Sequence, residues 1–140
     1  MKVIVVLLMA MLTSCVSNLT QEKQKKEKYT ARITYYSVGQ DKWGDKVACP
    51  QTPMAKEGIT IAAHPQFKFG TKVHIPQLEN KIGDGYFIVQ DRGGAVTKKK
   101  AAKGKAYVFD IFVKNQKLMW NHAYNRPMYM DVYVINTPNG

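Results

Sequence analysis

Short stretches of alternating apolar and polar residues make up most of the chain, separated by glycines, prolines and charges. This alternation is typical of half-buried β-strands and predicts six, over 29–38, 59–63, 71–75, 86–90, 105–113 and 128–135. Apolar residues have helical spacing over 116–124, where Asn115 suits an N-cap and Pro127 bars continuation. The pattern therefore predicts a mainly β fold, a small closed six-stranded barrel with one short helix.

The first residues have a different pattern. Lys2 precedes an apolar run over 3–12, which is shorter than the roughly 20 residues of a membrane-spanning helix and typical of a secretory signal. The run ends in Leu12-Thr13-Ser14-Cys15, which resembles a bacterial lipobox. We therefore expect a signal peptide over 1–14 and a lipid on Cys15. The alternative is a buried core strand with a stray cysteine.

The residues that follow Cys15 are polar and of mixed charge. They have almost no apolar surface to bury, so 15–28 is predicted to be a flexible linker, and 29–138 the folded domain. With Cys15 lipidated, Cys49 is the one thiol left, which excludes a disulfide within the domain. Cys49 has no histidine beside it, so we interpret it as a packed thiol.

The net charge of the 140 residues is +11, which favours polyanionic partners. A nucleic acid is not expected, because an exported chain meets the cell wall and anionic lipids, and no aromatic–basic recognition motif is present. The segment 95–106, between the fourth and fifth predicted strands, is rich in lysine, with lysines at 98, 99, 100, 103 and 105. They form either a solvated loop or a basic lip that concentrates an anionic polymer near a cleft.

Two aspartates are candidates for acid chemistry. Asp110 has apolar neighbours on both faces of its strand, and such surroundings raise the pKa of a carboxyl group towards that of a general acid. Alternation places Asp91 on the same face as Phe87 and Val89. The alternative for both is a structural aspartate, bonded to backbone amides or ending a strand in a turn. No histidine pair has zinc-site spacing, so neither a metal nor a cofactor is expected.

Five short motifs follow one another in a familiar order, and together they cover about residues 29–136. They are Thr34-Tyr35-Tyr36, Ile61-Ala62-Ala63-His64-Pro65, Phe69-Gly70-Thr71-Lys72-Val73, Val89-Gln90-Asp91-Arg92-Gly93-Gly94 and Phe109-Asp110-Ile111-Phe112. In this order the chain resembles the double-psi β-barrel of the 3D domain, shared by membrane-bound lytic transglycosylase A and related cell-wall hydrolases. It also resembles the barrel of rare lipoprotein A and, more distantly, expansins.

The resemblance implies roles for particular residues. Asp110 matches the catalytic aspartate, and Asp91 the supporting aspartate of the Asp-x-Gly-Gly motif. His64 stands where the first of the three aspartates is expected, as in the Ala-Ala-His segment of rare lipoprotein A. By the same resemblance His64 orients the acid or stabilises positive charge, whereas the substrate-binding residues are Tyr35, Tyr36, Arg92, Gly93 and Gly94. The two tyrosines are equally suited to the core.

The implied activity is lytic transglycosylation. The enzyme cleaves the β-1,4 bond between N-acetylmuramic acid and N-acetylglucosamine and forms a 1,6-anhydro ring. The alternative is a non-catalytic barrel that binds peptidoglycan. In either case we expect a monomer held in the cell envelope by the lipid on Cys15, at the periplasmic face of the outer membrane in a Gram-negative cell.

Overall fold

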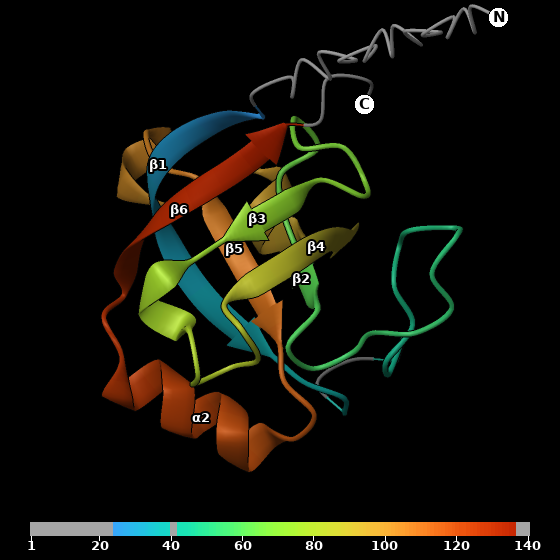
Figure 1. Cartoon of the computed structure of the whole chain (residues 1–140). Coiled ribbons are helices and arrows are strands. Elements are labelled where there is room, and N and C mark those ends of the chain that lie inside the picture. The colour runs from blue at the N-terminus through green and yellow to red at the C-terminus, as the bar shows by residue number, and fades with distance from the viewer. Residues whose placement is uncertain (1–23, 40–41, 137–140) are drawn as a thin grey trace, which may run out of the picture.

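The computed structural model describes residues 24–39 and 42–136, so the predicted signal peptide, Cys15 and most of the linker lie outside the described residues (Figure 1). Six strands close into a barrel in the order β1-β5-β2-β4-β3-β6. The strands are β1 (Lys25–Tyr36), β2 (Thr60–Ala62), β3 (Lys72–His74), β4 (Tyr86–Asp91), β5 (Val108–Phe112) and β6 (Tyr129–Asn136). The predicted six-stranded barrel with one short helix is confirmed.

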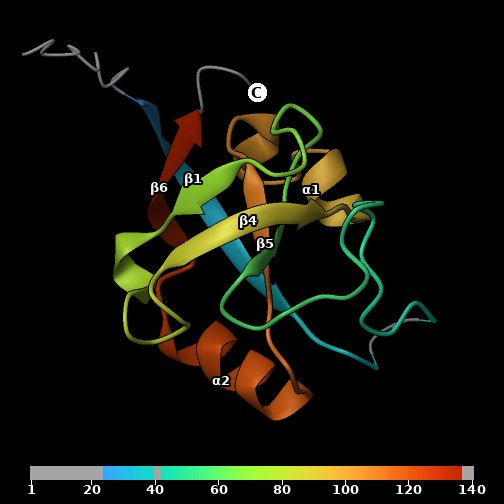
Figure 2. The same ribbon diagram turned by 45° about the vertical axis from the view of Figure 1, so that its right-hand side comes forward.

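Helix α2 (Gln116–Asn125) covers one end of the barrel, and three shorter helical turns lie in the connections. These are η1 (Pro76–Leu78), α1 (Gly94–Thr97) and η2 (Ala102–Gly104). The side chain of Asn115 accepts the backbone N–H of Leu118 at 2.9 Å, as the sequence predicts for the N-cap of α2. Strands β1 and β5 are parallel and run towards α2, whereas β6 returns to the opposite end (Figures 1 and 2).

The barrel interior is filled by the inward-facing residues of all six strands. Phe87 and Phe109 are completely buried there, with a shell of isoleucines, valines and leucine around them. Burial of each such side chain contributes about 1.5–3 kcal/mol relative to exposure, so the core holds the strands at fixed positions. Groups on the outer face of the barrel are therefore presented on a rigid support.

Strand β1 begins at Lys25 rather than at residue 29, which corrects the predicted end of the linker. The early residues pair with the last residues of β6, Lys25 with Asn136 and Lys28 with Tyr133. The Lys28 ammonium lies 3.0 Å from the carboxylate of Asp131, so a charge on this polar extension is matched by an opposite charge on the partner strand. Residues 25–28 are all charged, so they lack the alternation of apolar and polar residues from which a strand is predicted.

The lysine-rich segment between β4 and β5 packs against the barrel instead of forming a bare loop. Val96 and Ala101 are buried against Ala62 and Val108, in a small cluster separate from the main core. The lysines at 98, 100, 103 and 105 remain exposed. The segment therefore covers part of the outer face of β2 and β5, and β5 begins at Val108 rather than at residue 105.

Cys49 is buried, and its Sγ lies 3.3 Å from Oε1 of Gln51, so the prediction of a packed thiol is confirmed. Across 24–39 and 42–136, no helix has the length and apolar character needed to cross a bilayer.

Two glycines with left-handed backbone differ in the space around them and allow a test of the fold. A Cβ on Gly85 (φ +79°) would lie 2.8 Å from Cγ of Glu79 and 3.1 Å from the carbonyl oxygen of Ile75, whereas Gly70 (φ +85°) has nothing within 4 Å. We expect Gly70→Ala to cost about 1 kcal/mol from backbone strain, and Gly85→Ala about 3 kcal/mol. Urea unfolding of both variants measures the difference, and equal losses would contradict the close packing at Gly85.

Candidate functional site

One row of paired residues crosses four neighbouring strands on the outer face of the barrel. Thr34 of β1 pairs with Asp110 of β5, Asp110 pairs with Ala62 of β2, and Ala62 pairs with Asp91 of β4. Paired residues on adjacent strands point to the same side of the sheet. Because neighbouring strands lie about 4.8 Å apart, the backbones of Asp110 and Asp91 are separated by roughly 10 Å. The small side chain of Ala62 lies between the two carboxyl groups.

A register shift brings Asp91 into this row and overturns the prediction that it faces the core with Phe87 and Val89. Ile61 pairs with Val89, but the next residue, Ala62, pairs with Asp91, so Gln90 is an extra residue in β4. Such a bulge changes the side of the sheet to which the following residue points. The alternation of side chains along β4 therefore does not predict the side to which Asp91 points.

The carboxylate of Asp91 is held by three hydrogen bonds and is only 8% exposed. Its Oδ1 accepts the backbone N–H groups of Ala48 at 2.9 Å and Arg92 at 2.8 Å. Its Oδ2 accepts the hydroxyl of Tyr36 at 2.8 Å. Asp91 therefore joins β1, β4 and the segment that precedes β2, and its side chain is held in one position.

Asp110 is in a different environment. It is partly exposed, and its Oδ1 accepts the hydroxyl of Thr34 at 2.7 Å. Burial raises the pKa of Asp110 to about 6; the hydrogen bond from Thr34 opposes this increase, and the negative charge of Asp91 adds to it. A carboxyl group with such a pKa is half protonated at pH 6 and is suited to donate a proton.

Both carboxyl groups line one open cleft. A cavity of about 190 Å³ is lined by Tyr36, Ser37, Trp43, Gly44, Lys46, Ala62, Asp91, Arg92, Gly93 and Asp110. An adjoining cavity of about 310 Å³ is lined by Trp43, Lys46, Val47, Ala48, Asp91 and Arg92. The two cavities share four residues and form one continuous cleft. Figure 2 shows part of the segment between β1 and β2 beside the end of β4.

Trp43 and Lys46 are site residues that the sequence did not reveal. They lie on one tight turn, in which the N–H of Lys46 donates to the carbonyl of Trp43 at 3.2 Å and Gly44 has φ +65°. Trp43 is 60% exposed, so its indole faces the cleft and solvent. One feature of the sequence could have indicated Trp43: it is a tryptophan in a long segment rich in glycine and charged residues. Such a segment has no core in which to bury the ring, so the ring is expected at the surface.

The glycine-rich motif after β4 contributes to the cleft in part. The guanidinium of Arg92 donates to the carbonyls of Ala63 at 3.1 Å and Phe67 at 2.8 Å, so it mainly clamps the turn after β2 onto β4. Gly93 lines the cleft, and space is open where its Cβ would be. Gly94 begins α1 and is absent from the lining.

The structure separates Tyr35 and His64 from the cleft. Strand alternation sends Tyr36 outward and Tyr35 towards α2, where its ring stacks on His122 at 5.5 Å and burial raises the pKa of its hydroxyl to about 12. The Nδ1 of His64 accepts the N–H of Gln66 at 3.1 Å, and its ring packs on Tyr107. Neither residue lines the cleft with Asp110, so their predicted roles lack a geometric basis.

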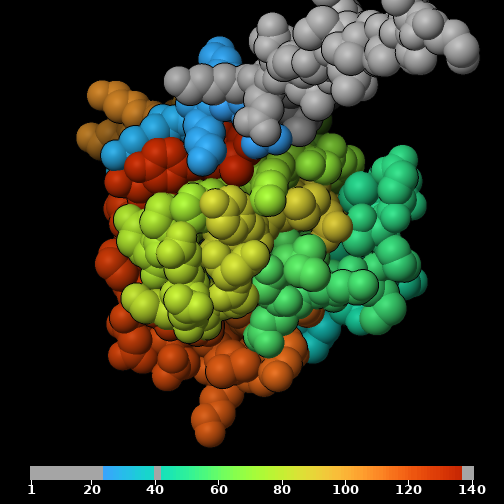
Figure 3. All heavy atoms as spheres, in the orientation of Figure 1, coloured from blue at the N-terminus to red at the C-terminus, as the bar shows by residue number. Residues whose placement is uncertain are grey.

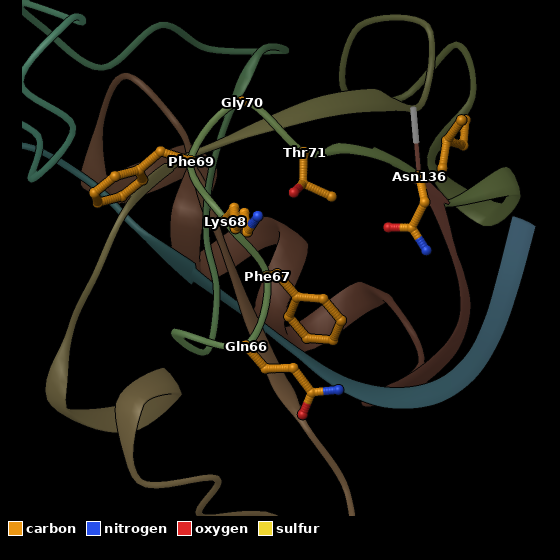
Figure 4. Close-up of a pocket in the computed structure, with 8 residues that line it drawn as sticks. Gln66, Phe67, Lys68, Phe69, Gly70, Thr71 and Asn136 are labelled. Carbon is orange, nitrogen blue, oxygen red and sulfur yellow. The ribbon is translucent and has the colours of Figure 1, made fainter. Parts of the chain in front are cut away.

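A further cavity, of about 340 Å³, lies between the turn after β2 and the end of β6 (Figure 4). Its lining residues are Gln66, Phe67, Lys68, Phe69, Gly70, Thr71, Ile135 and Asn136. They include no carboxyl group, so this cavity offers no acid. In the described ranges, no group of three histidine, cysteine or acidic side chains is arranged to hold a metal ion.

No protein-family model matches the chain, and no curated protein is significantly similar to it. The geometry of the cleft is therefore the main ground for a function.

The raised pKa of Asp110 predicts a pH-dependent cost in stability. Because its folded pKa of about 6 exceeds the ordinary value of 3.8, stability from this group is full below pH 3.8 and is lost as the pH rises through 6. Asp110→Asn is therefore expected to stabilise the protein at pH 8, by at most about 3 kcal/mol, and to have little effect near pH 3.5. Urea unfolding at both pH values measures this gain, and a variant less stable than the wild type at pH 8 would contradict it.

The two neighbours of Asp110 should move its pKa in opposite directions. Thr34→Val removes the hydrogen bond that stabilises the charged form, so the pKa of Asp110 should rise above 6. Asp91→Asn removes the nearby negative charge, so the pKa should fall. Carboxyl carbon chemical shifts, followed by NMR through a pH titration, report both changes. Tyr36→Phe, which keeps the charge of Asp91, is the control for disturbance of the segment held by Asp91.

Proposed function

We propose that this protein is a lytic transglycosylase that cleaves the glycan strands of peptidoglycan. The observation that supports this most strongly is the Asp110 carboxyl group, with a pKa of about 6, in an open cleft beside a second, buried carboxylate. An acid with this pKa remains partly protonated near neutral pH. The order of motifs noted in the sequence supports the same activity.

In the proposed reaction, protonated Asp110 donates its proton to the oxygen between N-acetylmuramic acid and N-acetylglucosamine. The bond from that oxygen to the anomeric carbon breaks as the 6-hydroxyl of the muramic acid attacks that carbon. The ionised Asp110 then accepts the hydroxyl proton, which restores the acid and leaves a 1,6-anhydro ring. The negative charge of Asp91 stabilises the positive charge that develops on the sugar and keeps Asp110 protonated.

The state of Asp91 favours this route over hydrolysis. A hydrolase needs a second carboxylate that activates water or attacks the sugar. Both oxygens of Asp91 already accept hydrogen bonds, from Ala48, Arg92 and Tyr36. These three bonds use most of the acceptor positions of the carboxylate, and Asp91 is only 8% exposed, so little of it is left to bind and activate a water molecule, whereas a hydroxyl supplied by the substrate needs no such group.

The walls of the cleft suit a sugar polymer. The exposed indole of Trp43 offers an apolar face for a sugar ring, and Lys46 beside it offers a charge to substrate carboxylates. The exposed lysines of the segment between β4 and β5 add positive charge nearby. A polymer that carries carboxylates on peptide stems would be concentrated there.

The proposed location is the cell envelope. The apolar run over 3–12 and the lipobox-like Leu12–Cys15 support export and a lipid on Cys15. The residues between Cys15 and β1, 16–24, extend at most about 30 Å. The barrel would thus act close to the membrane that holds it.

The activity is tested by digestion of purified sacculi and mass spectrometry of the released fragments. We expect anhydro-muropeptides from the wild type, and at least about a hundredfold less from Asp110→Asn, because the variant has no proton to donate. Above pH 6 the rate should fall about tenfold per pH unit. Asp131→Asn changes an aspartate paired with Lys28 away from the cleft and is the matched control.

Other products would reject the proposal. Fragments with ordinary reducing ends would identify a hydrolase. Binding to sacculi without any soluble product would identify a non-catalytic wall-binding barrel.

A further inference from the structure

Helix α2 exposes two aromatic rings at the end of the barrel opposite the start of β1 and the end of β6. Trp120 is 52% exposed and Tyr124 80% exposed, and their rings stack with centroids 5.9 Å apart and planes 25° apart. The opposite side of α2 is packed on the barrel through Met119 and His122. Two adjacent large aromatic side chains left in water, with the core already complete, indicate a binding surface.

We propose that Trp120 and Tyr124, the α2 aromatic pair, form a second glycan-binding surface that holds the polymer outside the cleft. This inference rests on the proposed function and extends it. The pair stacks on the apolar faces of sugar rings in the intact strand, and it takes no part in bond cleavage.

The composition of α2 favours a sugar over other partners. The helix contains no acidic residue, and the exposed amides of Asn121 and Asn125 lie on the same helix as the rings. Sugars need both groups, because their rings have apolar faces and their edges are hydroxyl and acetamido groups. The other exposed positions of α2 are mostly polar, so its apolar area falls short of the roughly 800 Å² per partner that a stable protein interface buries.

The start of the helix that carries the aromatic pair lies near one edge of the cleft. Gln116 begins α2, and its Nε2 lies 3.4 Å from the Cβ position of Gly39, just after the cleft residue Ser37. Gln116, Trp120 and Tyr124 are spaced four residues apart and so share one side of the helix. In the space-filling view, α2 (orange) forms the lower end of the molecule, next to the green segment before β2 (Figure 3). A strand leaving the cleft past Gly39 would reach the two rings in turn.

The orientation of the barrel supports the same partner. Strand β1 begins, and β6 ends, at the end of the barrel opposite α2 in both views (Figures 1 and 2). A membrane tether that precedes β1 would join the barrel at that end. The α2 aromatic pair would then face away from the membrane and towards the wall.

The test measures binding of the mature chain to insoluble sacculi. All samples carry Asp110→Asn, so that binding is read without turnover, and they include Trp120→Ala with Tyr124→Ala and a control, Met54→Ala, which trims an exposed apolar side chain elsewhere. We expect the double variant to bind about tenfold more weakly, through loss of two aromatic contacts, and the control to bind unchanged. Circular dichroism confirms that α2 is still folded.

Unchanged binding of the double variant would overturn the inference. So would a wild-type dimer that the double variant loses in sedimentation, or binding to anionic lipid vesicles that depends on the two rings. The result is separate from the proposed reaction: sacculi left without anhydro products by the wild type would reject the transglycosylase, whereas weakened binding of the double variant would still identify the glycan surface.

Discussion

The extra residue in β4 is the constraint on which the site depends. Without Gln90 as a bulge, Asp91 would continue the inward face of Phe87 and Val89, and an ionised carboxylate would be buried in the core at a cost of several kcal/mol. With the bulge, Asp91 joins the outer row and lies one strand beyond Ala62 from Asp110. The bulge thus moves the Asp91 side chain from the core, where its burial would be costly, to the lining of the cleft.

The two carboxyl groups have different roles because their partners differ. Asp91 accepts hydrogen bonds from two N–H groups and one O–H group, which hold its carboxyl oxygens in place. Asp110 has one such donor, Thr34, and apolar neighbours on its strand, which favour the protonated form. Like charges near each other also resist joint ionisation. Two aspartates of the same chemistry therefore differ through their surroundings alone: one carboxyl group is suited to donate a proton, and the other is held in place by its hydrogen bonds.

The sequence predicted what periodicity and local chemistry control. Alternation located the six strands, and the apolar flanks of Asp110 pointed to its raised pKa. Sequence patterns did not predict features that depend on tertiary contacts. These features are the bulge that turns Asp91 outward, the polar extension of β1 at Lys25, and the position of Trp43 in the cleft. Motif order predicts roles for His64 and Tyr35, but it does not determine to which side of a strand or turn a side chain points. The packing of Tyr35 on α2 followed from the same alternation that places Tyr36 in the cleft.

The four residues of the row come from distant parts of the chain, and Thr34 and Asp110 are 76 positions apart. Such long-range pairing forms late in folding, because the closure of each loop costs entropy before the contact forms. A partly folded chain holds Asp110 in water, where its pKa is that of any free aspartate. Acid strength at this position is thus a property of the closed barrel, and an unfolded chain carries an ordinary aspartate there.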